Sequence, residues 1–336
     1  MFTKTVKQAY RRASGLAKTP NATNSERLVS RTHLLAFIII LAAVTLTSLV
    51  SAKHLGNWGA PLNAESLPGT SPELNTTFNE GYPILSPDGL SLYIVSDRPG
   101  GSGALDIYVA NRARQDDPFG APENLGLPVN SSANDHSPTP VPGHGLFFVS
   151  SRPGSCGPTP NDDIYFTRFK NGAWEEPQNV GCQINSIAAE SSPSYFEDES
   201  GNAVLYFSSN RAGGFGLQDI YFSVDFGPAQ PVPGLNTAFN DVRPNVRKDG
   251  TEIVFDSTRP GGSGQDDIWT AGRETTADDW SMPTNLGSGI NSPARETRAT
   301  LSKDGMTMFF ASNRAGGDGL SDIYLTTREK LTPNER

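Results

Sequence analysis

The sequence predicts an all-β protein built from five copies of one structural unit, and three observations lead to this prediction. First, an aromatic residue followed by Pro recurs at intervals of 52–61 residues within one repeated phrase that fills residues 58–328. Second, each copy holds short apolar runs bounded by Gly, Pro and Asp, which is typical of strands and turns. Third, the last copy lacks its fourth strand, and a strand of that kind precedes the first copy.

Each copy runs from an Asn, through an acid five residues later, to a strand ending in Ser-x-Arg, a Gly-rich loop and an Asp-Ile-aromatic triplet. The Asn positions are Asn75, Asn130, Asn185, Asn236 and Asn291. The acids are Glu80, Asp135, Glu190, Asp241 and Glu296. The arginines are Arg98, Arg152, Arg211, Arg259 and Arg314. The triplets begin at Asp106, Asp163, Asp219, Asp267 and Asp322.

Four strands are expected in each copy. The inner strand follows the acid, as in residues 82–86, and a turn such as Asp88-Gly89 leads into the second strand. The second strands, 92–96, 146–150, 205–209, 253–257 and 308–312, are rich in aromatic and β-branched residues, as buried strands are. The third strand begins at the Asp-Ile-aromatic triplet. The fourth is marked by Trp58, Phe119, Trp174, Phe226 and Trp280, and the Pro close behind each predicts an outer edge strand.

A four-stranded sheet cannot bury both of its faces alone, whereas five such sheets packed around an axis can. The sequence therefore predicts a five-bladed β-propeller of four-stranded blades over residues 53–328, followed by a C-terminal tail at 329–336. The repeated region begins near Trp58 with a strand that matches the fourth strand of a copy, and it ends at 323–327 with a third strand. The N-terminal strand is therefore expected to complete the last blade and close the ring.

The first 52 residues differ from the repeats. Residues 1–31 carry seven Lys and Arg and the single acid Glu26, and residues 32–52 hold no charge and an apolar core. Val50-Ser51-Ala52 is a small-residue cleavage pattern. This order predicts a basic segment followed by a signal peptide or a transmembrane anchor helix, so the propeller is expected to be exported to the periplasm or the cell exterior. Cleavage after Ala52 and anchoring in the inner membrane stay open alternatives.

Charge narrows the range of partners. The whole chain has a net charge of −9, and without its first 31 residues it carries 20 positive and 35 negative side chains, a net charge of −15. Because binding to nucleic acid depends on neutralising phosphates with Lys and Arg, no nucleic-acid partner is expected.

The repeated residues resemble the WD-repeat-like propeller repeats of the TolB type. The resemblance depends on Ser86-Pro-Asp-Gly89, on Ser-x-Arg and on Gly-Gly-x-Gly followed by Asp-Ile-Tyr, and it covers about four-fifths of the chain. It implies a non-catalytic platform of the bacterial envelope. TolB itself has six blades and a separate N-terminal domain, which these repeats lack, so its partners are not carried over.

The repeated acids and arginines are expected at the same end of the propeller, where they would form a structural ring, because a feature present in every blade performs a task in every blade. Glu80, Asp135 and Glu190 also suggest an alternative, a hydrolase acting on glycans with inner-strand carboxylates. Since Asp241 and Glu296 occupy the same position in the other two copies, the acids are interpreted as repeat consensus and the protein as a non-enzyme.

Residues that break the repeat are the better candidates for a ligand site. Tyr82, Ser137 and Ser192 are replaced by Arg243 and Arg298 in the fourth and fifth copies, and Asp256 stands where the others have Val, Ser or Ala. A buried acid there needs a partner. The candidate ligand-binding residues are Tyr82, His136, Arg243, Asn245, Arg247 and Arg298, expected to form a partly basic sector near the mouth of the axis.

The two cysteines, Cys156 and Cys182, lie at the same predicted end, and an exported chain favours a disulfide between them. Two cysteines and distant histidines are too few for a zinc site, and neither a metal nor another cofactor is expected. His33, His54 and His144 receive no role.

The sequence thus predicts an exported five-bladed propeller that docks an envelope protein or a glycan without catalysis. The glycan-acting hydrolase is the first alternative, and a structural module without a ligand is the second.

Overall fold

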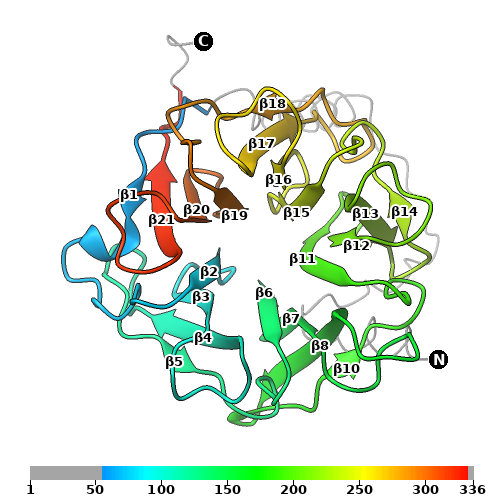
Figure 1. Cartoon of the computed structure of the whole chain (residues 1–336), viewed down its shortest axis with the longest axis horizontal. Coiled ribbons are helices and arrows are strands. Elements are labelled where there is room, and N and C mark those ends of the chain that lie inside the picture. The colour runs from blue at the N-terminus through cyan, green and yellow to red at the C-terminus, as the bar shows by residue number, and fades with distance from the viewer. Residues whose placement is uncertain (1–54, 332–336) are drawn as a thin grey trace, which may run out of the picture.

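The computed structural model describes residues 55–331, which form five β-sheets arranged as blades around a central axis (Figure 1). The first blade holds β2 (Glu80–Leu85), β3 (Ser91–Ser96), β4 (Asp106–Asn111) and β5 (Glu123–Asn124). The second holds β6 (Asp135–Val141), β7 (Gly145–Ser150), β8 (Asp163–Lys170), β10 (Gln178–Asn179) and the additional strand β9 (Ala173–Trp174). The third holds β11 (Glu190–Glu197), β12 (Ala203–Ser209), β13 (Asp219–Val224) and β14 (Gln230–Pro231). The fourth holds β15 (Asp241–Val246), β16 (Glu252–Ser257), β17 (Asp267–Gly272) and β18 (Thr284–Asn285). The fifth holds β19 (Glu296–Leu301), β20 (Thr307–Ser312), β21 (Asp322–Thr327) and β1 (Leu62–Asn63), after which the short 3-10 helix η2 (Ala64–Ser66) follows.

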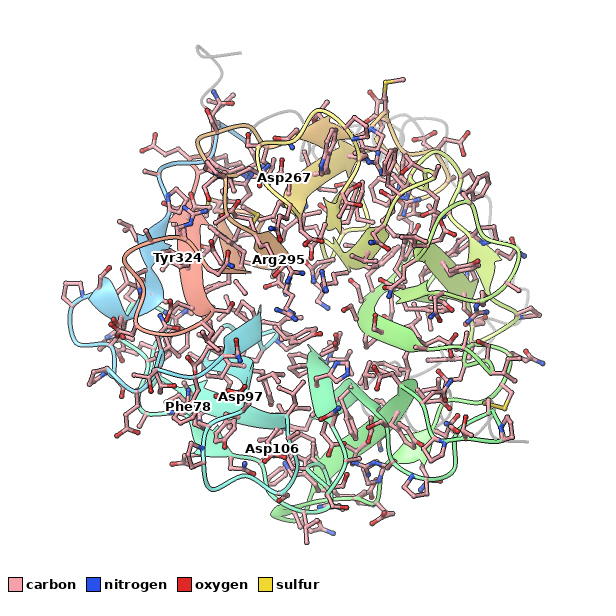
Figure 2. The ribbon with its side chains drawn as sticks, viewed as in Figure 1. Phe78, Asp97, Asp106, Asp267, Arg295 and Tyr324 are labelled. Atoms are coloured by element: carbon pink, nitrogen blue, oxygen red, sulfur yellow. A yellow bond between two sulfur atoms is a disulfide. The ribbon has the colours of Figure 1, made fainter. Side chains whose placement is uncertain are left out.

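The predicted five-bladed ring and its four-stranded blades are confirmed. In each blade the strand that begins with the repeated acid lies nearest the axis, and the two-residue fourth strand lies at the rim (Figure 1). The second blade carries one strand more, because β8 extends to Lys170 and pairs with β9 beyond the end of β10. The labelled Asp106 and Asp267 occupy the same position in two blades and lie on opposite sides of the ring (Figure 2).

The closure of the ring by the N-terminal strand is also confirmed. β1 pairs antiparallel with β21, with Leu62 opposite Leu325, and completes the fifth blade. The seam holds a second link, because the amide of Asn75 donates to the carbonyl oxygen of Ile323 at 3.2 Å and accepts from its N–H at 2.8 Å. The seam therefore joins the two ends of the propeller through backbone pairing and a buried amide.

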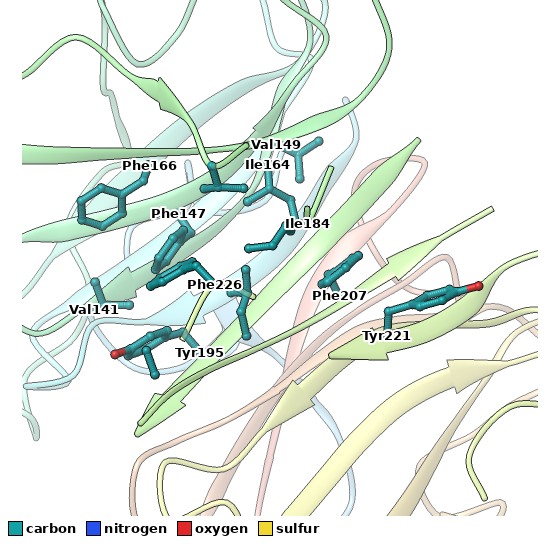
Figure 3. Packing of buried hydrophobic residues seen from close by; sticks show 13 residues of the cluster. Val141, Phe147, Val149, Ile164, Phe166, Ile184, Tyr195, Phe207, Tyr221 and Phe226 are labelled. Carbon is teal, nitrogen blue, oxygen red and sulfur yellow. The ribbon is translucent and has the colours of Figure 1, made fainter. Parts of the chain in front are cut away.

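The hydrophobic core lies between neighbouring blades. The cluster between the second and third blades joins aromatic side chains of both, among them Phe147, Phe207 and Phe226 (Figure 3). The second strands supply most of the fully buried residues, since they are covered on both faces. Because full burial of such side chains stabilises by about 1.5–3 kcal/mol each, inter-blade packing is the main support of the ring.

The fourth strands differ from the expectation in position. Each begins four residues after its aromatic marker, so that Phe119 precedes β5 and Trp280 precedes β18. The Pro after the marker therefore stands at the entry to the strand, and only Pro231 lies within one. Their edge location, which the Pro residues predicted, is confirmed.

The Gly-rich loops wrap the carboxylate that begins each third strand. In the first blade Asp106 accepts hydrogen bonds from the backbone N–H of Ser102 and Gly103. Gly100 has φ of +96°, and a Cβ on Gly101 would stand 1.8 Å from the Asp106 carboxylate. The first glycine thus supplies the left-handed turn, and the next supplies space.

None of the described helices is long and apolar enough to cross a membrane. The expected signal or anchor segment at 32–52 and its basic flank at 1–31 lie outside the described residues.

Candidate functional site

Each repeated acid forms an ion pair with the repeated arginine of its own blade. The carboxylates are fully buried, and the arginine side chains are 10–19% exposed. The pairs are Glu80–Arg98 at 3.0 Å, Asp135–Arg152 at 2.8 Å, Glu190–Arg211 at 3.0 Å, Asp241–Arg259, and Glu296–Arg314 at 3.0 Å. Every guanidinium also lies over the aromatic ring of its Asp-Ile-aromatic triplet, at 4.8–5.3 Å from the centroid.

Each of these acids also accepts hydrogen bonds from the connection that precedes it. Glu80 accepts from the hydroxyl groups of Thr76 and Ser96 and from the backbone N–H of Thr76, in addition to Arg98. Three of these hydrogen bonds reach Oε1 and one reaches Oε2, so the carboxylate is fixed in place by its own blade. The geometry therefore fits an acid that ties the inter-blade connection to the second strand.

A second ring, closer to the axis, consists of residues in left-handed backbone conformation. One such residue interrupts each inner strand as a β-bulge, with φ between +51° and +58°. They are Tyr82, Ser137, Ser192, Arg243 and Arg298, and all five line an axial cavity of about 30 Å³. Because non-glycine residues rarely adopt this conformation, its presence in every blade marks a constrained mouth of the axis.

Two arginines of this ring share one buried acid. Asp256 on β16 accepts from Arg243 Nη1 at 3.0 Å and from the backbone N–H of Arg298 at 2.9 Å. Burial raises the pKa of Asp256 to about 6, against the lowering effect of the Arg243 charge. As expected from the sequence, the buried Asp256 has partners, namely Arg243 of its own blade and Arg298 of the next blade.

Arg298 forms no salt bridge within the part of the chain that the structure describes. Its guanidinium lies 4.2 Å from the centroid of the Tyr82 ring, and its buried Nε has no hydrogen-bond partner there. Arg298 and Tyr82 stand in the fifth and first blades, so this contact crosses the seam of the propeller. The arrangement leaves one cation at the axis without a carboxylate.

His136 completes this cluster from the second blade. Its Nδ1 lies 2.9 Å from the hydroxyl of Ser137, its Nε2 lies 3.4 Å from Asp162, and its ring lies 5.3 Å from that of Tyr82. Burial acts to raise the pKa of Tyr82, but the positive charges of Arg298, His136 and Arg243 lower it to about 6. Burial likewise opposes protonation of His136, but Tyr82 and Asp162 raise its pKa above the usual range.

Two of the predicted ligand-binding residues, Asn245 and Arg247, form structural interactions within the propeller. Asn245 lines the axial cavity, and its side-chain oxygen accepts from the backbone N–H of Leu301 in the next blade at 2.8 Å. Arg247 does not join the cluster. It is 2% exposed and forms ion pairs with Asp249 and Glu252 in the turn after β15. It lies past the end of the strand, so the two-residue alternation that grouped it with Arg243 no longer applies.

Asp162 and the ring serines were not among the candidate ligand residues. Asp162 lies in the longer loop of the second blade, directly before the repeated Asp163. Its contact with His136 depends on the fold of that loop and has no local signal. Ser137 and Ser192 occupy the same repeat position as Arg243, so the repeat alignment itself pointed to them.

The predicted disulfide is confirmed. Cys156 and Cys182 are bonded, with their Cα atoms 5.6 Å apart. The bond ties the long loop of the second blade to the connection that leads into the third.

Comparison with known proteins supports the fold. No protein-family model and no curated protein matches the sequence. Among solved structures, TolB from Acinetobacter baumannii is similar at a TM-score of 0.50 and 16% identity, over 91% of this chain and 72% of that one. An α-L-arabinofuranosidase from Lactobacillus brevis is similar at a TM-score of 0.51 and 11% identity, over 82% of this chain and 96% of that one.

At these identities the likeness concerns the fold alone. The fold and repeats define the class of the protein, a five-bladed β-propeller. In fold it is similar both to TolB and to the arabinofuranosidase.

Proposed function

We propose that this protein is an exported, non-catalytic propeller that binds an envelope protein or glycan at the axial mouth, by accepting an anionic group of that partner. The observation that carries the proposal is the Arg298 guanidinium, a cation at the axis without a carboxylate partner among the described residues. A carboxylate or phosphate would satisfy it through charge-assisted hydrogen bonds.

The asymmetry of the cluster supports a ligand role. Arg243 already pairs with Asp256, and His136 contacts Asp162, whereas Arg298 forms no carboxylate salt bridge among the described residues and has the Tyr82 side chain, ring and hydroxyl, as its neighbour. The axial cavity of about 30 Å³ holds little more than a water molecule, so the partner group would sit at the mouth. A protruding carboxylate fits such a mouth better than a whole sugar ring does.

The proposal of a non-catalytic role depends on the ion pairs that the five repeated acids and Asp256 form. Glycoside hydrolysis needs two carboxyl groups facing one glycosidic bond. Here the five repeated acids are paired and buried, and Asp256 bonds to Arg243 and Arg298. None of these six acids is therefore left without a cationic partner.

Export is supported by two independent features. The basic segment followed by an uncharged apolar run is the order of a signal or anchor. The Cys156–Cys182 disulfide suits an oxidising compartment.

A binding screen on a glycan array and in an envelope pull-down tests the proposal, with Arg298→Asn as the decisive variant. Asn tolerates the left-handed backbone at this position, so the variant should keep the bulge while losing the charge. We expect a captured acidic partner to bind at least tenfold more weakly, equivalent to about 1.4 kcal/mol.

The matched control is Arg295→Asn, which removes a charge from the residue directly before β19, the strand that carries Arg298. Arg295 is 46% exposed and pairs with Asp266 outside the axial ring, so binding should be unchanged. An equal loss of binding in both variants would show that the partner responds to the overall charge of the protein and not to a site at Arg298. Turnover of a glycan that disappears in Glu80→Gln, with the fold intact, would establish the hydrolase instead.

A further inference from the structure

Three blades of this propeller place an arginine of their own on the aromatic residue that precedes the fourth strand. The pairs are Arg112 over Phe119, Arg273 over Trp280 and Arg328 over Trp58, with 4.1–4.4 Å between guanidinium and ring centroid. In each, the Nε donates to the glycine carbonyl of the turn between the first two strands, at 2.6–2.9 Å. The repeat thus builds a guanidinium site from one aromatic ring and one carbonyl.

The second blade has the aromatic residue but lacks the arginine. Phe169 occupies the arginine position, because its N–H donates to the carbonyl of His144 as the N–H of Arg112 donates to that of Leu90. Phe169 meets Trp174 edge-on at 5.3 Å and is itself 42% exposed. Trp174 is partly exposed, whereas the aromatic residue at the same position of the third blade, Phe226, is only 2% exposed. The second blade alone therefore combines a partly open aromatic ring with a missing cation.

A groove opens at this place. It lies between the first and second blades, has a volume of about 880 Å³, and is lined by Tyr93, Phe169 and Trp174 together with the carboxylates of Asp88 and Glu123. Its lining includes no Lys or Arg. The groove on the other side of the first blade, of about 480 Å³, contains Arg112 and two lysines. The contrast shows that the open groove has the acidic and aromatic parts of a cation site.

We propose that this groove binds an arginine side chain of a partner polypeptide, with the guanidinium on Trp174 where the other blades place their own arginine. Gly143 stands where Gly89 stands in the first blade and lines the groove, so its carbonyl corresponds to the acceptor that Arg112 uses. Arginine is favoured over lysine because its planar guanidinium can stack on the Trp174 ring. In the same position its N–H groups can donate hydrogen bonds to an acceptor beside the ring. The volume leaves space for residues that flank the arginine.

The test is a titration of the purified full-length chain, labelled with 15N in its tryptophan indoles, with the capped peptide acetyl-Gly-Arg-Gly-amide. The indole signal of Trp174, assigned with Trp174→Phe, should shift saturably. The same peptide with citrulline, which has the shape of arginine without its charge, should bind at least tenfold more weakly.

Phe169→Arg is the critical variant, since it introduces the arginine that three other blades have at this position. The new side chain should fill the groove and exclude the arginine of the peptide. We expect the variant to fold with an unchanged or higher Tm and to bind the peptide at least tenfold more weakly, whereas Phe169→Ala should retain binding. Should Phe169→Arg fail to fold, the double variant Asp88→Asn/Glu123→Gln gives the answer, with the same loss expected. Undiminished binding in the folded arginine variant or in the double variant, equal binding of the citrulline peptide, or no shift in the unaltered protein would overturn the proposal.

Discussion

The guanidinium of Arg298 lies 4.2 Å from the centroid of the Tyr82 ring, across the seam where the fifth blade meets the first. Both residues occupy the β-bulge position of their inner strands. The closure of the ring therefore brings together two residues 216 positions apart in the sequence. We make four predictions, which concern this contact, the interactions repeated around the ring, and the disulfide.

Tyr82 should ionise far below the other tyrosines. Burial opposes ionisation, but Arg298, His136 and Arg243 lower the pKa of Tyr82 to about 6, from an ordinary value near 10. A lowered folded-state pKa contributes stability that is absent below about pH 6 and grows as the pH rises toward 10. A spectroscopic titration of tyrosinate absorbance should show one early step that Tyr82→Phe removes. Arg298→Ala should move that step to higher pH, and a step unaffected by either substitution would contradict the assignment.

The acid–arginine pairs should act in every blade. Alanine at Arg98, Arg152, Arg211, Arg259 or Arg314 leaves a buried carboxylate without its cation, and each change should cost roughly 3 kcal/mol of unfolding free energy. Arg295→Ala, which breaks a half-exposed pair, should cost about 1 kcal/mol or less. Denaturant unfolding measures both. A loss confined to two or three of the five blades would argue for a local role of those acids.

Reduction should destabilise the propeller. Breaking the Cys156–Cys182 disulfide, which spans 26 positions, should cost about 3 kcal/mol and lower the Tm by roughly 5–10 °C. The Cys156→Ser/Cys182→Ser variant should show the lower Tm with or without reductant. A Tm of the unaltered protein that is indifferent to reductant, or two titratable thiols in the oxidised protein, would refute the prediction.

The third glycine of the Gly-rich loops should be intolerant of a side chain. A Cβ on Gly264 would stand 2.0 Å from the carbonyl oxygen of Ala294, on the connection into the next blade. Gly264→Ala should therefore cost about 2 kcal/mol or more, because backbone must move. Gly289 meets nothing within 4 Å, and Gly289→Ala should change stability by less than about 1 kcal/mol. Thermal unfolding of the two variants compares them, and similar Tm values would contradict the close approach.

Much of the architecture was predictable because its signals are local. Apolar runs rich in aromatic and β-branched residues, Asp-Gly turns and the edge Pro residues placed the strands, and the additional strand near Trp58 predicted the closure with β21. The fourth strands were misplaced by four residues, since the aromatic marker lies before the strand and the Pro that follows it stands at the strand's entry. The added strand β9 depends on the extension of β8, which the repeat pattern does not contain.

The sequence by itself determined the repeat, the number of blades, the seam and the two cysteines that pair, because each follows from periodicity, turn chemistry or a count. Only the tertiary structure decided which charges meet. Arg243 and Arg247 share one alternation, yet the first reaches the axis and the second is buried in a turn, because the strand ends between them. Arg298 lacks a carboxylate, and Trp174 lacks an arginine, only in relation to neighbouring blades. Such relations arise when residues distant in the chain are brought together, and no local pattern contains them.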